Sequence, residues 1–392
     1  MMTRVHAALF WLLPLLVSCR GVPTHPMLTP SEASPVTDYS SFEQYVAKTE
    51  QLLTRHRYFL TSDTQTEITA NLPFERSADK VLQPTRGVLL IHGLGDSPWS
   101  FVDIAESLSQ HGFLVRTLLL SGHGTRPADM LVADHDSWQQ EVHRQVALLK
   151  ADVGEVYLGG FSTGGNLAYL EAAADPVIKG LMLFSPGFES GQSLARFAPL
   201  LSRFTPWLFV PNPDRLTNYT RYASMPTNGF SQYYKTSTKA MSSLSREKFR
   251  RPVFIALSEH DSVLDSAEIQ RLFVENFTHP QSRLIWFGTS PPGLADERTL
   301  YIDSKLPSLR ISNMSHMGIL FSPDNPYYGI NGSERICHNG QELEGASDYC
   351  RSGGEVWYSA WGHNESGKVH ARLTLNPYFK TMMKEVRSTF TF

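Results

Sequence analysis

The sequence predicts an α/β fold with a mostly parallel central sheet and helices on both of its faces. From residue 86 to residue 277, short apolar runs alternate with segments of helical length, which is the pattern of a parallel sheet. One of the runs, Gly87–Ile91, is continuously apolar, as expected of a strand buried on both faces. The length of 392 residues is enough for one large domain with insertions.

The first residues predict an export signal over residues 1–18. A basic residue precedes the apolar run Val5–Val17, which is too short for a membrane span. The run ends in Leu16-Val17-Ser18-Cys19, which resembles the lipobox of bacterial lipoproteins, whose cysteine becomes the lipidated first residue of the mature chain. With Arg20 after the cysteine, this resemblance implies a lipid anchor in the outer membrane of a Gram-negative cell, on its periplasmic or its surface face. A plain secretory signal with an incidental cysteine is the alternative.

Residues 19–38 carry four prolines among Thr, Ser and Gly, a composition that predicts an extended, semi-rigid tether between membrane and domain. After residue 20, no stretch is apolar for long enough to cross a bilayer. The net charge is −3, and both signs are mixed along the chain. The sequence therefore shows no basic cluster of the kind that binds nucleic acid.

The elements of the domain follow in order. A helix is predicted over residues 40–57, with strands at 67–74 and 86–92. Further helices are predicted at residues 101–110, 137–150, 166–174, 267–277 and 377–387, and further strands at 113–120, 155–161, 180–185 and 252–257. Residues 282–287 and the segment around residues 293–305 fill the long interval before residue 309. The domain thus consists of residues 39–187 and residues 251–392, on either side of a long insertion.

That insertion, residues 188–250, is rich in aromatic residues and methionine, which argues against disorder and predicts a lid over the site. We call it the lid segment. Residues 323–369, the second insert, hold Cys337 and Cys350. In an oxidising compartment we expect a disulfide between them, worth about 3 kcal/mol on the chain-entropy model; two free thiols are the alternative. No Cys/His spacing of the zinc type surrounds the cysteines, so no metal site is expected there.

A nucleophile is predicted where the strand at 155–161 ends. Gly160-Phe161-Ser162-Thr163-Gly164 fits the pattern G-x-S-x-G, in which the serine lies on a sharp turn between strand and helix. Glycines are needed because side chains there would strike the neighbouring strand and helix. Two backbone N–H groups should stabilise an oxyanion, that of Thr163 and that of Leu94 in the loop after the strand at 86–92.

A serine hydroxyl becomes a nucleophile when a base takes its proton and a third group orients the base. Asp261, just after the strand at 252–257, is the predicted acid, with Glu259 and Asp265 as close rivals. His316 is the predicted base, because it comes after the acid and follows a predicted strand at residues 309–312.

Other histidines are weighed against this assignment. His363, in the second insert, and His370, directly after it, are the alternatives for the base. His92 and His123 each stand beside glycines after a predicted strand. We interpret both as turn residues that shape the site rather than as catalytic groups.

Together these motifs resemble the α/β-hydrolase superfamily, and within it serine carboxylesterases and monoacylglycerol-lipase-like enzymes, over roughly residues 86–320. The resemblance rests on His92-Gly93-Leu94-Gly95, Ser121-Gly122-His123-Gly124, Gly160–Gly165, His260-Asp261-Ser262-Val263 and Ser315-His316-Met317-Gly318. It implies hydrolysis of a carboxylic ester through an acyl-enzyme, with no cofactor and no metal. Ser162 would be the nucleophile, His316 the base and then the acid, Asp261 its orienting partner, and the amides of Leu94 and Thr163 the oxyanion donors.

Rival functions remain at this stage. Acyl transfer, thioester hydrolysis and peptide hydrolysis can occur on the same scaffold, because pocket shape and water exclusion decide among them. A lipid-anchored binding protein on an inactive scaffold is a further alternative, although the sequence lacks no member of the triad. The expected partners are a small-molecule or lipid ester substrate and the membrane, through the anchor.

Overall fold

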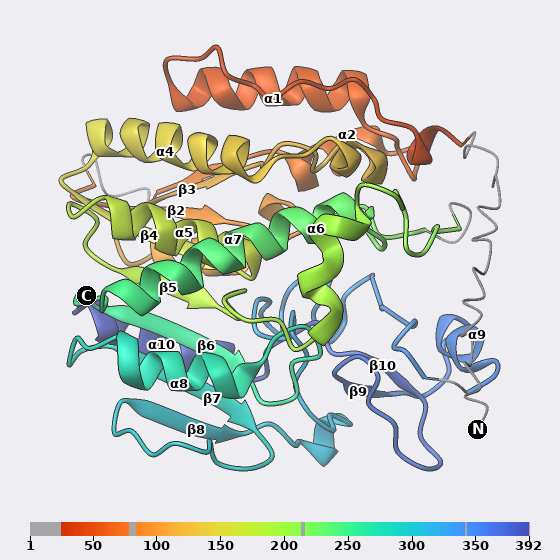
Figure 1. Cartoon of the computed structure of the whole chain (residues 1–392). Coiled ribbons are helices and arrows are strands. Elements are labelled where there is room, and N and C mark those ends of the chain that lie inside the picture. The colour runs from red at the N-terminus through yellow and green to blue at the C-terminus, as the bar shows by residue number, and fades with distance from the viewer. Residues whose placement is uncertain (1–24, 78–83, 213–215, 342, 392) are drawn as a thin grey trace, which may run out of the picture.

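The computed structural model describes residues 25–77, 84–212, 216–341 and 343–391. Its described part contains an eight-stranded sheet in the order β1-β3-β2-β4-β5-β6-β7-β8 (Figure 1). β1 pairs antiparallel with β3, and the other neighbours in this sheet pair in parallel. The predicted α/β fold with a mostly parallel sheet is confirmed.

The strands of the sheet are β1 Glu75–Arg76, β2 Arg86–Ile91, β3 Phe113–Leu118, β4 Glu155–Phe161, β5 Leu181–Phe184, β6 Val253–Ser258, β7 Arg283–Gly288 and β8 Thr299–Asp303. A separate parallel pair consists of β9 Trp357–Ser359 and β10 His370–Arg372. The α-helices are α1 Phe42–His56, α2 Thr64–Asn71, α3 Val102–Ser109, α4 His135–Asp152, α5 Thr163–Ala174, α6 Ala198–Leu201, α7 Thr227–Arg246, α8 Ser266–Asn276, α9 Ala346–Arg351 and α10 Phe379–Phe390. Short 3₁₀ helices include η3 Pro127–Leu131, η4 Ser193–Phe197 and η6 Pro307–Leu309.

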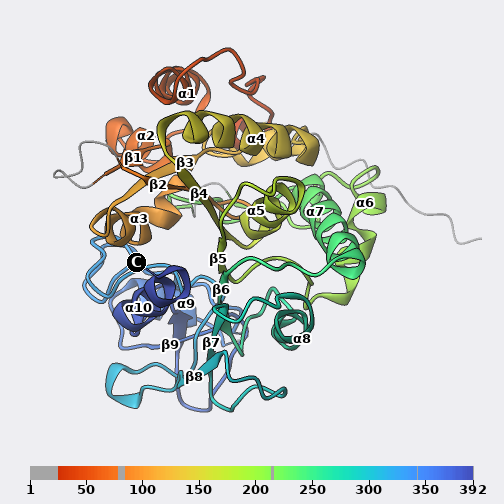
Figure 2. The ribbon, with the colours of Figure 1, turned by 90° about the vertical axis from the view of Figure 1, so that its left-hand side faces the viewer.

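Helices cover both faces of the sheet. Figure 2 shows the sheet edge-on, with α3 and α10 on one side, α4, α5 and α8 on the other, and α7 outside α5. Alternate residues of β2 enter the two cores: Leu89 packs with α4 and α5, and Val88 packs with α3 and α10. Each such side chain contributes about 1.5–3 kcal/mol when it is buried. Burial on both faces explains why β2 is apolar from Gly87 to Ile91.

The predicted strand at residues 67–74 is wrong, because α2 occupies most of it. Asp63 caps this helix, accepting from the N–H of Thr66 at 3.1 Å. Glu67 is fully buried and pairs with Arg57 at 2.9 Å. Arg57 follows α1, so a partner from another element, invisible to local propensity, holds the helix in place.

The predicted tether at residues 19–38 is corrected for its described part. Met27 and Leu28 are buried, and the N–H and hydroxyl of Ser31 donate to Asp129 in η3 at 2.5 and 2.7 Å. The chain from residue 25 onward therefore packs along the domain, because these contacts outweigh the extension that its prolines favour. The predicted signal and Cys19 lie outside the described residues. Among the helices that the structure describes, none combines the length and the apolarity that a bilayer span requires.

The lid segment lies between β5 and β6, where the sequence predicts it, but part of it belongs to the core. Ala240 and Leu244 of α7, and Phe249 after it, pack in the same apolar cluster as α4 and α5. The earlier part of the segment, with η4 and α6, carries many exposed apolar side chains instead. The lid segment therefore combines an exposed apolar surface, around η4 and α6, with a helix, α7, that packs in the core.

The predicted strand at residues 309–312 is also wrong. Only isolated bridges form there, from Ile311 to Leu306 and to Tyr358. The N–H of Tyr358 in β9 donates to the carbonyl of Arg310 at 2.7 Å, and the N–H of Ser312 donates back to Tyr358 at 2.9 Å. The second insert thus supports the loop that leads to His316. Its cysteines, Cys337 and Cys350, are joined in the disulfide that the sequence predicts, with Cα atoms 5.6 Å apart.

Candidate active site

Ser162 occupies a strained turn between β4 and α5. Its backbone has φ 53° and ψ −118°, a left-handed conformation that non-glycine residues seldom adopt. A Cβ on Gly160 would lie 2.2 Å from the carbonyl oxygen of Gly164, and one on Gly164 would lie 2.0 Å from that of Ile91. Sterics therefore require glycine at both places, and Ser162 is held at the carboxyl edge of the sheet.

Asp261 and His316 meet at this edge. The Nδ1 atom of His316 lies 2.6 Å from Oδ2 of Asp261, whose side chain is fully buried. The other oxygen of Asp261 accepts from the backbone N–H groups of Val263 and Leu264 at 2.8 and 3.1 Å. These two bonds turn Oδ2 toward the imidazole, which leaves Nε2 of His316 as the ring nitrogen available for proton transfer.

The rival carboxylates have other partners. Glu259 accepts from the N–H groups of Thr289 and Ser290 at 2.5 and 3.1 Å. Asp265 is the N-cap of α8 and accepts from the N–H of Glu268 at 3.0 Å. Of the three carboxylates that the sequence offers, only Asp261 faces His316.

The phenyl ring of Phe161 links the serine to this pair. The residue directly precedes Ser162, and its ring centroid lies 4.8 Å from that of the His316 imidazole. In the described part of the chain, no hydrogen bond joins the Ser162 hydroxyl to His316. Contacts of this kind often tighten only when substrate binds. His363 and His370, the alternative bases, lie together beside Glu365 instead.

The two amides predicted to bind an oxyanion belong to the turn after β2 and to the first residue of α5. Leu94 belongs to the tight turn in which the N–H of Asp96 donates to Gly93 at 3.2 Å. A Cβ on Gly93 would lie 2.9 Å from the ring of Phe161, so this turn passes close to the end of β4. Thr163 is the first residue of α5, where N–H groups lack intrahelical acceptors and the helix dipole favours negative charge.

His92 and His123 have structural partners, in agreement with their interpretation as turn residues. Nε2 of His92 accepts from the N–H of Leu120 at 3.1 Å, and Nε2 of His123 accepts from the N–H of Gly95 at 3.0 Å. Burial lowers the pKa of both rings, that of His123 to about 4. Both rings are therefore neutral near pH 7, as a hydrogen-bond acceptor must be.

Acid should weaken the fold through His123. The ring titrates near pH 6.5 in the unfolded chain and near pH 4 in the native state, so the unfolded state binds more protons between these values and stability falls as the pH is lowered. His123→Gln retains a hydrogen-bond acceptor but does not titrate. Between about pH 7 and about pH 4.5, we expect its free energy of unfolding to fall by about 2 kcal/mol less than that of wild type. Urea unfolding at both pH values measures this. The exposed His111→Gln is the control, and equal losses in all three proteins would contradict the prediction.

Two residues of the lid segment approach the site, and the motifs did not reveal them. Nε of Arg221 lies 3.4 Å from the buried carboxylate of Asp96, and its Nη1 lies 3.0 Å from Sδ of Met317. Arg221 thus ties the turn that contains Leu94 to the residue after His316. Tyr233 of α7 packs on Gly187, where a Cβ would meet both its ring and the backbone of Ser162. An ion pair across an insertion leaves no local signal in the sequence.

Residues 83–289, more than half of the chain, match the family described as serine aminopeptidase, S33 (Hydrolase_4). The chain is 26% identical over 196 residues to a thermostable monoacylglycerol lipase of Bacillus sp. (strain H-257), a match that covers 48% of this chain and 75% of the lipase. The match to the family ends before the His316 loop and the second insert.

The structure of this chain is similar to solved structures of lipolytic enzymes. One comes from work on LipS and LipT, two metagenome-derived lipolytic enzymes, with a TM-score of 0.47 and 22% identity over 56% of this chain and 87% of that chain. Another is the monoacylglycerol lipase of Paleococcus ferrophilus, with a TM-score of 0.45 and 20% identity over 55% of this chain and 88% of that chain.

Proposed function

Because the chain belongs to the serine aminopeptidase, S33 family of hydrolases, we propose that it is a serine hydrolase that cleaves carboxylic esters with an apolar acyl chain, such as monoacylglycerol-like lipids. One observation carries the proposal: the 2.6 Å contact between His316 and the buried Asp261, at the sheet edge where the strained Ser162 lies. A buried carboxylate, an imidazole and a serine on a tight turn are the components of a nucleophilic triad.

The reaction would proceed in two halves. The Ser162 hydroxyl attacks the ester carbonyl carbon while Nε2 of His316 takes its proton, and Asp261 stabilises the imidazolium through Nδ1–H. The amides of Leu94 and Thr163 donate to the oxyanion; the loss of one such donor typically costs about 3 kcal/mol. The intermediate collapses to the acyl-enzyme, and His316 returns its proton to the departing alcohol. Water, deprotonated by His316, then releases the carboxylic acid and restores the serine.

The surface of the lid segment supports a lipid substrate. Within residues 194–210 it exposes Leu194, Phe197, Leu200, Leu201, Phe204, Leu208, Phe209 and Val210. The exposed fractions reach 77% for Phe204 and 83% for Phe209. Soluble proteins rarely leave large apolar patches in water unless the patch contacts a lipid or a partner. A lipid anchor at Cys19, in the outer membrane of a Gram-negative cell, would hold this surface near its substrate.

The test is a panel of substrates presented to the purified chain. Esters of p-nitrophenol with rising acyl length should be hydrolysed, and kcat/KM should increase with chain length, because each buried methylene contributes about 0.8 kcal/mol. Amino-acid p-nitroanilides and acyl thioesters serve as comparison substrates, since the family's description names aminopeptidases. Turnover of anilides or thioesters without turnover of esters would contradict the proposal and assign the scaffold to a peptidase or a thioesterase.

A variant of the exposed surface extends this test to lipid aggregates. Phe204→Ser combined with Phe209→Ser should leave kcat/KM on a soluble short-chain ester within about twofold of wild type, as surface changes usually do. On monoacylglycerol in vesicles, the rate should fall at least about tenfold, because about 1.4 kcal/mol of interfacial apolar burial is lost. Ile330→Ser, at an exposed apolar residue of the second insert, is the matched control. Equal rates on vesicles for both variants would exclude a role of this surface in substrate access.

A further inference from the structure

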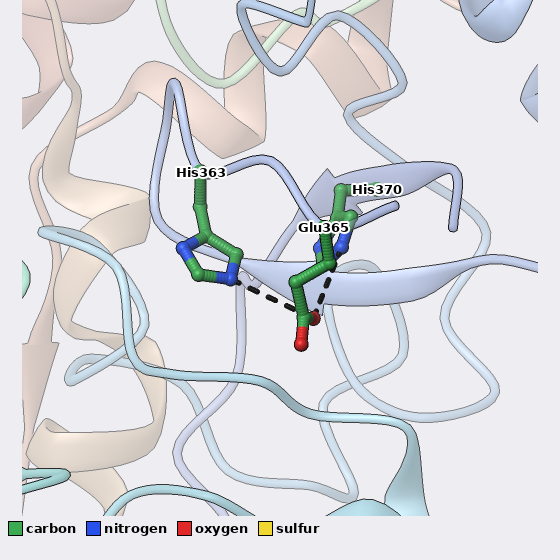
Figure 3. A group of neighbouring side chains, drawn as sticks. All are labelled: His363, Glu365 and His370. Atoms are coloured by element: carbon green, nitrogen blue, oxygen red, sulfur yellow. Dashed lines mark ion pairs between the residues drawn. The ribbon is translucent and has the colours of Figure 1, made fainter. Parts of the chain in front are cut away.

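A second group of ionisable side chains lies in the second insert and at the start of β10. Figure 3 shows His363, Glu365 and His370 with their polar atoms pointing toward one another. Nε2 of His363 is 3.6 Å, and Nε2 of His370 is 3.3 Å, from the same carboxylate oxygen, Oε2 of Glu365. One polar atom from each of the three residues lies within 4.8 Å of the other two.

The histidines of this group lack partners that their burial requires. The His370 side chain is 0% exposed, and neither of its ring nitrogens makes a hydrogen bond to any residue that the structure describes. Nε2 of His363 is likewise buried without a hydrogen-bond partner in the described part of the chain. A buried polar atom left unsatisfied is unfavourable. Among the described residues, none therefore supplies the hydrogen-bond partner that these buried nitrogens need.

The spacing of the three atoms fits a tetrahedral ion. Zinc binds imidazole nitrogen and carboxylate oxygen at about 2.0–2.1 Å, so two ligands of a tetrahedron lie about 3.3 Å apart. The two separations from Oε2 of Glu365, 3.6 and 3.3 Å, are close to that value. The imidazole rings meet edge to face, with centroids 5.2 Å apart, so both can direct Nε2 at one point.

We propose that His363, Glu365 and His370 bind a divalent transition-metal ion of the zinc type, with water as the fourth ligand. Two imidazoles and one carboxylate suit zinc, whereas calcium and magnesium prefer sites made only of oxygen. The two cysteines nearby are joined to each other and are not ligands. The sequence predicts no metal site around the cysteines; the proposed site is formed instead by His363 and Glu365 of the second insert and by His370, which directly follows it.

Neighbouring residues orient the carboxylate of Glu365. The hydroxyl of Ser312 donates to Oε2 of Glu365, and Nζ of Lys368 donates to Oε1 at 3.1 Å. These two hydrogen bonds hold the carboxylate in one orientation, as the neighbours of a metal ligand usually do.

The position of the site gives the ion a structural role. Ser312 lies four residues before His316, on the loop that β9 supports. The ring of His363 lies 6.5 Å from that of His260, the residue before Asp261. An ion bound here would fasten the second insert against the two loops that carry His316 and Asp261, without entering the reaction.

Metal binding can be measured without any activity assay. The chain, freed of any histidine tag and treated with a chelator, should bind one equivalent of Zn²⁺ by calorimetry, and its Tm should rise, because the ion binds only the folded state. Co²⁺ in its place should give the strong visible absorption of a tetrahedral site. Glu365→Gln and the half-exposed His363→Ala should weaken Zn²⁺ binding at least about 100-fold and abolish the rise in Tm.

His135→Ala is the matched control. Asp134, His135 and Asp136 form the other group of potential ligands in the described part of the chain, but they are consecutive residues at the start of α4, and His135 is already bonded to Gln232 at 3.0 Å. This variant should bind one equivalent as wild type does. The proposal is overturned if the folded wild type binds no Zn²⁺, if His363→Ala and Glu365→Gln bind it as tightly as wild type, or if His135→Ala loses it instead.

Discussion

Ser162→Ala should lower kcat on a p-nitrophenyl ester by about 10,000-fold or more, because removal of a triad nucleophile leaves only the catalysis of the oxyanion donors and of binding. Alanine keeps the Cβ that the turn already accommodates at φ 53°, so the fold and the Tm should change little. A fluorophosphonate probe should label the wild type at Ser162 and should not label the variant. Circular dichroism and thermal melting verify that the variant is folded.

Ser202→Ala, in the lid segment, is the control for this change and should keep both turnover and labelling. Two results would count against the nucleophile. If folded Ser162→Ala still reacts with the probe at wild-type rate, another residue carries the reaction. If the folded wild type is not labelled and hydrolyses none of the substrates, the chain is a binding protein on an inactive scaffold.

Asp261→Asn should lower kcat by about 10,000-fold with little change in KM. One oxygen of Asp261 accepts from the N–H groups of Val263 and Leu264 at 2.8 and 3.1 Å. In asparagine the amide oxygen must take that place, which turns the NH₂ group toward Nδ1 of His316. The imidazole would then carry its proton on Nε2, the atom that must accept the proton of Ser162. The variant should fold normally and still position the serine, so the effect appears in kcat.

Asp265→Asn provides the contrast. Asp265 caps α8 through the N–H of Glu268 at 3.0 Å, and asparagine caps helices about as well as aspartate. Its kcat and its stability should both stay close to wild type. If Asp265→Asn lost activity and Asp261→Asn did not, the role of the acid would move to Asp265, and the 2.6 Å contact between Asp261 and His316 would be structural.

Several elements could be predicted from the sequence because their signals are local. The continuous apolar run of β2 and the helical spacing of α4 follow from which faces each element buries. α2 could not be predicted in this way, because its buried Glu67 is stabilised by an ion pair with Arg57, the residue that follows α1. The loop at residues 309–312 is apolar enough for a strand, but its backbone partner is Tyr358 in the second insert rather than the sheet.

The sequence by itself determined the class of the fold and the turn that holds Ser162, since both follow from patterns among neighbouring residues. The tertiary structure decided which of three carboxylates faces His316, that the chain from residue 25 packs on the domain, and that His363, Glu365 and His370 converge near Ser312. The physical reason is distance along the chain. Local patterns record which face of an element is buried, whereas the approach of side chains from separate loops depends on how the whole core packs.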